Sequence, residues 1–186
     1  MDVLIPAFIA VLLAETGDRV QNQAHQLGLT FPDHRSIYVA LITVTLINLS
    51  IGGIGGSYIA NLISFEARTL FAGLALLLAG LPMLLRVSPA KPITQTRPFL
   101  AGLTRFFPAQ IAGASPFIIA GLTARSDMAG FAIAGGFAGV MVAAIPALLL
   151  REEWPGVLPL IPLRYVAAVL LIGAGLWLAI NALRLI

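Results

Sequence analysis

The stretch Glu15-Thr16-Gly17-Asp18-Arg19 places two carboxylates and a guanidinium inside a first segment that is otherwise almost entirely apolar. It follows AVLLA and precedes VQNQAHQ. The whole chain has only 8 acidic residues, and two of them stand three positions apart here. Ionisable side chains at membrane depth are costly and usually mark a path for ions, protons or substrates. This stretch is therefore the first candidate for a functional site.

The composition is that of an integral membrane protein. Of 186 residues, 59% are hydrophobic and only 10% are charged, whereas soluble domains carry about 25% charged residues. The absence of cysteine excludes disulfides, thiolate metal sites and cysteine nucleophiles. The Lys and Arg residues stand mostly in loops, which fits an anionic lipid surface better than nucleic acid. No basic residue precedes the first apolar run, so we read that run as a retained helix and not as a signal peptide.

Hydrophobic segments of about 20 residues, the length that crosses a hydrocarbon core of about 30 Å, follow one another along the chain. They cover residues 3–29, 37–63, 69–85, 98–122, 128–150 and 163–185. The longest polar connection divides the chain into a first half at 1–87, a linker at 88–97 and a second half at 98–186. We therefore predict an all-α integral membrane fold with six transmembrane helices.

The two halves look like a diverged repeat. Ala79-Gly80-Leu81 in the third segment matches Ala174-Gly175-Leu176 in the sixth. Because each half would have three spans, the second half would enter the membrane upside down, as two inverted three-helix repeats whose substrate site lies near midplane. Glycine runs at 52–56 and 135–139 are typical of close helix packing and would let the first and fourth segments approach each other.

The distribution of basic residues predicts the orientation. The side with more of them would hold Arg35, Arg86, Lys91, Arg97, Arg151 and Arg164, and the other side would hold Arg68, Arg125 and Arg184. The positive-inside rule then puts the central linker in the cytoplasm and both termini outside.

Helical geometry gathers the polar groups of the first segment. A rise of about 1.5 Å per residue puts Glu15 roughly 18 Å into the first helix, a little beyond midplane. Glu15, Asp18 and Asn22 share one face. Gly17 permits a local break, which would free backbone carbonyls. These oxygen ligands suit Mg²⁺, Ca²⁺ or Mn²⁺. A purely structural role for Asp18, paired with Arg19 or another basic group, is the alternative, although a buried pair rarely offsets its desolvation.

ETGDRVQ resembles the Glu-x-Gly-Asp-(Lys/Arg)-(Ser/Thr) signature of the Golgi manganese/calcium–proton exchanger family. The bacterial members of that family export manganese, and the family is related to LysE-type transporters. The resemblance implies that Glu15 and Asp18 are the metal ligands and that they also exchange protons. It implies that Arg19 helps to shape the site and that Gln21 lies beside it. Val20 departs from the signature and removes one hydroxyl oxygen.

The family carries a second copy of the signature in the fourth span, and the corresponding stretch here reads TRFFPAQ. When the two stretches are aligned on their final glutamines, Thr104 corresponds to Glu15 and Phe107 corresponds to Asp18. Only the glutamine, Gln110, is retained in the second copy. Both carboxylates of the second copy are therefore missing.

Arg105 adds a positive charge to this degenerate copy, while Pro108, Gly113 and Pro116 still predict a broken helix. Three hypotheses follow. The site could be weakened or altered and still move a cation. Two copies of the chain could complete one site as a homodimer. The fold could also persist without divalent transport, with Arg105 as internal counter-ion to Glu15 or Asp18.

The leading prediction is a multi-pass transporter of the bacterial inner (plasma) membrane that exports a divalent cation, manganese or alternatively calcium, in exchange for protons. The predicted partners are the cation, protons and lipid, with no nucleic acid and no cofactor beyond the transported ion. The alternative is a membrane protein that keeps the fold as a scaffold or regulator. An enzyme is not expected, because the sequence has no cysteine and indicates no metal-binding histidine pair and no serine placed beside a candidate base. The predicted site comprises Glu15, Asp18, Gln21 and Asn22, shaped by Gly17, Arg19, Thr104, Arg105 and Gln110.

Overall fold

The computed structural model describes residues 2–32, 34–85, 93–157 and 159–183, and over these ranges the chain is helical and contains no strand. The all-α prediction is therefore confirmed. The elements are α1 (Leu4–Glu15), α2 (Arg19–Thr30), α3 (Arg35–Ala60), α4 (Phe65–Met83), α5 (Pro98–Ile111), α6 (Ser115–Ser126), α7 (Ala129–Leu150), the 3-10 turn η1 (Arg151–Glu153), α8 (Trp154–Val157) and α9 (Leu160–Ala182).

The length and apolar character of the described helices support four to five membrane spans, against the six predicted. The helices α3, α4, α7 with η1, and α9 are each long and apolar enough to cross a membrane. The pair α5 and α6 makes the fifth candidate, bent by 52° at a short break. The first segment falls short because it is divided into α1, a shorter apolar helix, and the polar α2.

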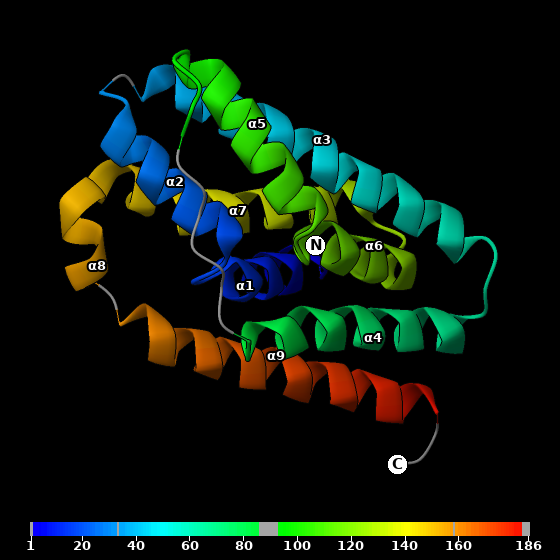
Figure 1. Cartoon of the computed structure of the whole chain (residues 1–186). Coiled ribbons are helices and arrows are strands. Elements are labelled where there is room, and N and C mark those ends of the chain that lie inside the picture. Colours follow the sequence, from blue (N-terminus) through cyan, green and yellow to red (C-terminus); the bar gives the residue numbers. More distant parts are fainter. Residues whose placement is uncertain (1, 33, 86–92, 158, 184–186) are drawn as a thin grey trace.

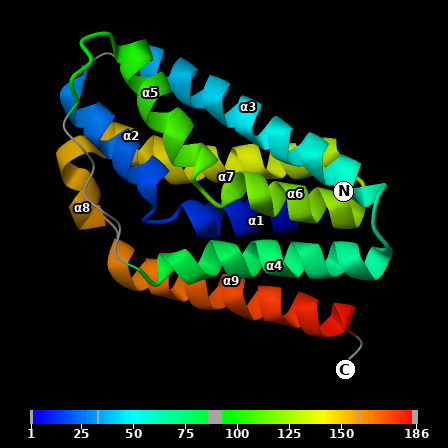
Figure 2. The ribbon, with the colours of Figure 1, turned by 45° about the vertical axis from the view of Figure 1, so that its right-hand side comes forward.

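Both halves show the same order of elements, a broken helix followed by two long helices (Figure 1). The two breaks lie midway along the bundle, and α4 and α9 lie side by side on one face (Figures 1 and 2). The inverted relation of the halves and the division at 1–87, 88–97 and 98–186 stay predictions. Half of that linker lies outside the described residues, as do Arg86, Lys91 and Arg184.

The basic residues gather at helix ends as the charge pattern predicts. In Figure 2, α3, α5 and α9 begin and α7 ends on the left, whereas α4 begins and α6 ends on the right. The first end carries Arg35, Arg97, Arg151 and Arg164, and the second carries Arg68 and Arg125. The compartment that each end faces stays a prediction.

The two glycine runs press against the broken helix of the opposite half. A Cβ atom on Gly56 of α3 would lie 2.9 Å from the Cα of Ala120 in α6. A Cβ atom on Gly139 of α7 would lie 2.8 Å from the carbonyl oxygen of Phe8 in α1. The interpretation of these runs as close packing is confirmed, and it explains how the first and fourth segments come together in the middle of the bundle.

The matched Ala-Gly-Leu triplets also share one interface, between α4 and α9. A Cβ atom on Gly80 would lie 2.9 Å from the carbonyl oxygen of Ala168, and one on Gly175 would lie 2.7 Å from that of Gly73. Each triplet therefore lets its helix approach the backbone of the other. This equivalence of packing agrees with the repeat that the triplets suggested.

We expect Gly56→Ala to destabilise the protein by about 1–3 kcal/mol, the usual effect of forcing one more carbon into a tight core. The added Cβ would meet backbone of α6, which cannot rotate away. Unfolding of the purified protein in detergent, followed by circular dichroism, measures the change.

The matched control is Gly55→Ala, one residue earlier, where a Cβ meets nothing within 4 Å. That change should be neutral or raise stability by up to about 1 kcal/mol, the helix-propensity difference between Gly and Ala. Equal effects of the two substitutions would contradict the packing described here.

Candidate functional site

The first helix break is built by the motif itself. Gly17 has φ 69°, a left-handed conformation that glycine adopts without steric penalty. Its N–H donates to the Oε1 atom of Gln21 at 2.7 Å, and the Gln21 Nε2 atom donates to the carbonyl of Ala143 at 2.8 Å. Gln21 thus ties the break to α7 with both ends of its amide. Gln21 was predicted to lie beside the cation site. In the structure its side-chain amide stabilises the turn at Gly17.

Glu15 is the last residue of α1 and is only 2% exposed. Its Oε1 atom accepts a hydrogen bond from the hydroxyl of Ser115, which is buried at the first position of α6. Its Oε2 atom is buried and has no hydrogen-bond partner among the described residues. The two broken helices therefore meet at this carboxylate, which keeps one oxygen uncommitted.

The second break lies at Ala112 to Ala114, between α5 and α6. The predicted discontinuity is confirmed, but it falls beyond TRFFPAQ, which is helical throughout. Aligning the chain on its two breaks pairs IAGASP with ETGDRV, so that Gly113 corresponds to Gly17. Ile111 and Ala114 then take the places of Glu15 and Asp18. This alignment differs by seven residues from the one that was based on the final glutamine. In both alignments the second half lacks the two carboxylates.

The residues of α5 that were predicted to shape the site are placed elsewhere. Thr104 is exposed, and its hydroxyl donates to the carbonyl of Leu100 in its own helix at 2.8 Å. Gln110 is buried and donates to the Thr45 hydroxyl of α3 at 2.8 Å. Arg105 is half-buried and does not line the cavity at the breaks.

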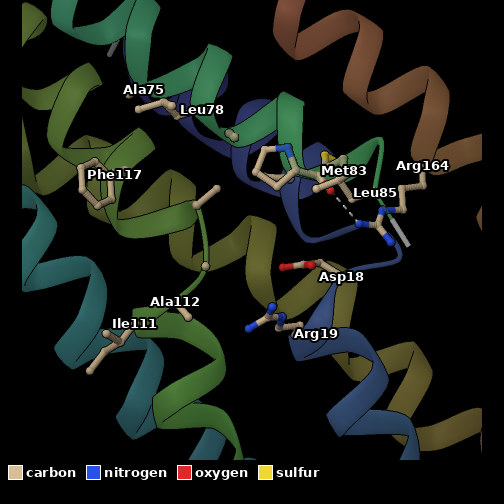
Figure 3. A pocket seen from close by; sticks show the side chains of 15 residues that line it. Asp18, Arg19, Ala75, Leu78, Met83, Leu85, Ile111, Ala112, Phe117 and Arg164 are labelled. Carbon is tan, nitrogen blue, oxygen red and sulfur yellow. Dashed lines mark hydrogen bonds between the residues drawn. The ribbon is translucent and has the colours of Figure 1, made fainter. Parts of the chain in front are cut away.

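A cavity of about 370 Å³ lies where the two breaks face one face of α4 and the beginning of α9. Its lining includes Ile111 to Ala114 at the second break. The charged side chains that reach into it are Asp18, Arg19 and Arg164 (Figure 3). A neighbouring cavity of about 490 Å³ is lined by Gly17, Asn22 and again Arg164. Asn22 therefore lies beside the motif, but in this second cavity.

Arg164, which the sequence analysis counted only for orientation, contributes a positive charge to the site. Its aliphatic part packs against Gly17, because a Cβ atom added to Gly17 would lie 3.3 Å from the Arg164 Cδ. Its Nη2 atom donates to the Pro82 carbonyl of α4 at 3.3 Å. The positive charges that act on Asp18 are those of Arg164 and Arg19. Arg164 therefore takes the place beside Asp18 that the sequence analysis predicted for Arg105.

The acidic groups of the motif act on each other as well. The negative charge of Asp18 acts on Glu15. Within the described ranges, no three His, Cys, Asp or Glu side chains come together. A cation at this point would therefore draw on the two carboxylates of the first break, with hydroxyl and backbone oxygens completing its shell.

Two helices broken at mid-bundle that meet at a buried carboxylate are an arrangement typical of membrane transporters with discontinuous helices. The family model described as divalent cation/proton antiporter GDT1 matches residues 3–90, which hold α1 to α4 and the first break. Over residues 3–90 the chain is therefore similar to that antiporter family. No curated protein and no solved structure matches the chain.

Sequence reasoning missed Ser115 and the role of Arg164. Ser115 precedes Pro116 just after Gly113, a pattern that marks the start of a helix after a break. Arg164 stands in LIPLRYVAAVLL, inside an apolar run, and was counted only for orientation. An isolated ionisable residue in such a run is itself a signal of function.

We expect Ser115→Ala to destabilise the protein by about 1–3 kcal/mol, because it leaves a buried carboxylate without its hydrogen-bond donor. Thermal unfolding in detergent measures the difference. Thr104→Ala is the matched control, since that hydroxyl is exposed and bonds only within its own helix. A larger loss for Thr104→Ala than for Ser115→Ala would contradict the register set by the helix breaks.

Proposed function

We propose that the protein exchanges a divalent cation for protons, with manganese as the leading cation and calcium as the second. The observation that carries this proposal is Glu15, a buried carboxylate with one uncommitted oxygen at the meeting point of two broken helices. The antiporter family of the first half supports the class of substrate.

The mutual repulsion of Glu15 and Asp18 supplies a physical basis for exchange. Two like charges in an apolar interior are costly, and either a bound dication or a proton on one carboxylate relieves that repulsion. The two ligands therefore compete for the same pair of groups. Competition of this kind couples the release of the cation to the uptake of protons.

The cavity supports a route to Asp18 from the end of the bundle where α4 ends and α5 begins. It extends from Asp18 along α4 to Pro82, Met83 and Leu85. In the proposed orientation this end faces the cytoplasm of a bacterial cell, and the cation would enter from there and be exported. The positive-inside rule is the basis for this orientation.

One chain supplies this site in our proposal, without a second copy. Glu15 already meets Ser115 of the other half, and both residues are buried within a single chain. A homodimer that joins two ETGDR motifs would have to open this contact.

The second candidate function is a membrane protein that keeps the fold without divalent transport. Two observations favour it. Ile111 and Ala114 replace the acids at the second break, and Arg164 brings a positive charge to the first.

We expect Mn²⁺ uptake into proteoliposomes with an imposed pH gradient to exceed that of empty vesicles. Glu15→Gln and Asp18→Asn should each reduce the rate at least about tenfold, the effect of about 1.4 kcal/mol of lost cation binding. Uptake of Mn²⁺ and Ca²⁺ and the accompanying proton flux are measured with fluorescent indicators.

Asp127→Asn is the matched control, because Asp127 is exposed at the end of α6 and asparagine tolerates its left-handed backbone. This variant should transport at the wild-type rate. A wild-type rate equal to that of empty vesicles would exclude antiport and favour the second candidate.

A further inference from the structure

We infer that Arg164 is a built-in competitor of the transported cation and sets the affinity of the site for divalent ions. This inference rests on the proposed function, because it assigns a specificity-determining residue to the same site. It requires that the Arg164 guanidinium stand beside the acidic motif, that it be free to withdraw, and that its charge oppose a dication.

The position of Arg164 meets the first requirement. It lines both cavities beside the motif, the one that contains Asp18 and the one that contains Asn22. Met83 and Leu85 of the α4 end also line both. Figure 3 shows Arg164 reaching toward Asp18 from α9, on the side of the cavity formed by the α4 end. A cation that enters from this end must pass its guanidinium.

The weak attachment of Arg164 meets the second requirement. A guanidinium that holds a structural pair normally uses its planar fork in bidentate bonds to a carboxylate. Arg164 instead donates one long bond of 3.3 Å to the Pro82 carbonyl, which also accepts from the N–H of Leu85. Its buried Nε has no partner among the described residues. Few interactions therefore oppose a change of rotamer.

The charge count meets the third requirement. Glu15 and Asp18 together carry two negative charges when ionised, and Arg19 and Arg164 carry two positive charges. The site is thus formally neutral before any cation arrives. Arg19 belongs to the motif and is exposed on α2, whereas Arg164 comes from the second half, outside the range that matches the antiporter family. Removal of Arg164 would leave one net negative charge and strengthen the attraction for a dication.

The test measures Mn²⁺ binding to the purified full chain in nanodiscs by titration calorimetry, for the wild type and three single variants. Arg164→Met keeps the aliphatic contact with Gly17 and removes the charge. It should bind Mn²⁺ at least about tenfold more tightly than the wild type, a change of about 1.4 kcal/mol. Arg164→Lys keeps the charge and should stay within about twofold of the wild type, as should Arg97→Met, which removes an exposed charge at the same end of the bundle.

A double variant separates competition from a general change of the fold. Adding Asp18→Asn to Arg164→Met restores the formal charge balance and should return the affinity to about that of the wild type. If Arg164→Met does not fold, Arg164→Gln replaces it in the same comparison. Unchanged or weaker Mn²⁺ binding by the folded, uncharged variant would overturn the inference.

The outcomes also separate this inference from the proposed function. Tight, Asp18-dependent binding by Arg164→Met, together with a wild type that transports nothing, supports the competitor and excludes antiport by the natural chain. Wild-type transport with no gain of affinity in Arg164→Met supports antiport and excludes the competitor.

Discussion

A carboxylate buried in an apolar bundle must find a partner, and much of the structure follows from the partner that Glu15 finds. The hydroxyl of Ser115 reaches it from the other half of the chain. For that contact to form, both helices must stop at mid-bundle and both stops must lie side by side. The Gly17 turn and the Ala112 to Ala114 break meet this requirement. Breaks of this kind are where the proposed exchange of a cation would take place.

Small residues make the meeting of the two breaks possible. Without a hydrophobic driving force between helices in lipid, association depends on close van der Waals contact. The glycines of α3 pack against α6, and those of α7 pack against α1. Each half of the chain therefore packs closely against the broken helix of the other half. The site therefore depends on an exchange of contacts between halves, although the acidic groups all come from the first.

The charge distribution divides the functional roles unequally between the halves. The first half supplies Glu15 and Asp18, the two carboxylates on which the proposed cation exchange depends. The second half supplies a neutral hydroxyl at its break and the Arg164 charge from α9. A site of this kind starts formally neutral, and its preference for a dication depends on how far the arginine withdraws.

Composition predicted the membrane setting and the all-helical fold. Pro108, Gly113 and Pro116 predicted the broken fourth helix, and the ETGDR motif carried the antiporter resemblance. These follow from local chemistry, since apolar runs, glycine turns and prolines act within a few residues of themselves. Only the tertiary structure decided that the second break falls at Ala112, that Ser115 is the donor to Glu15, and that Arg164 and not Arg105 faces Asp18. Those contacts join residues about 100 or more positions apart, and which of several basic side chains turns toward an acid depends on how helices pack, which no local pattern records.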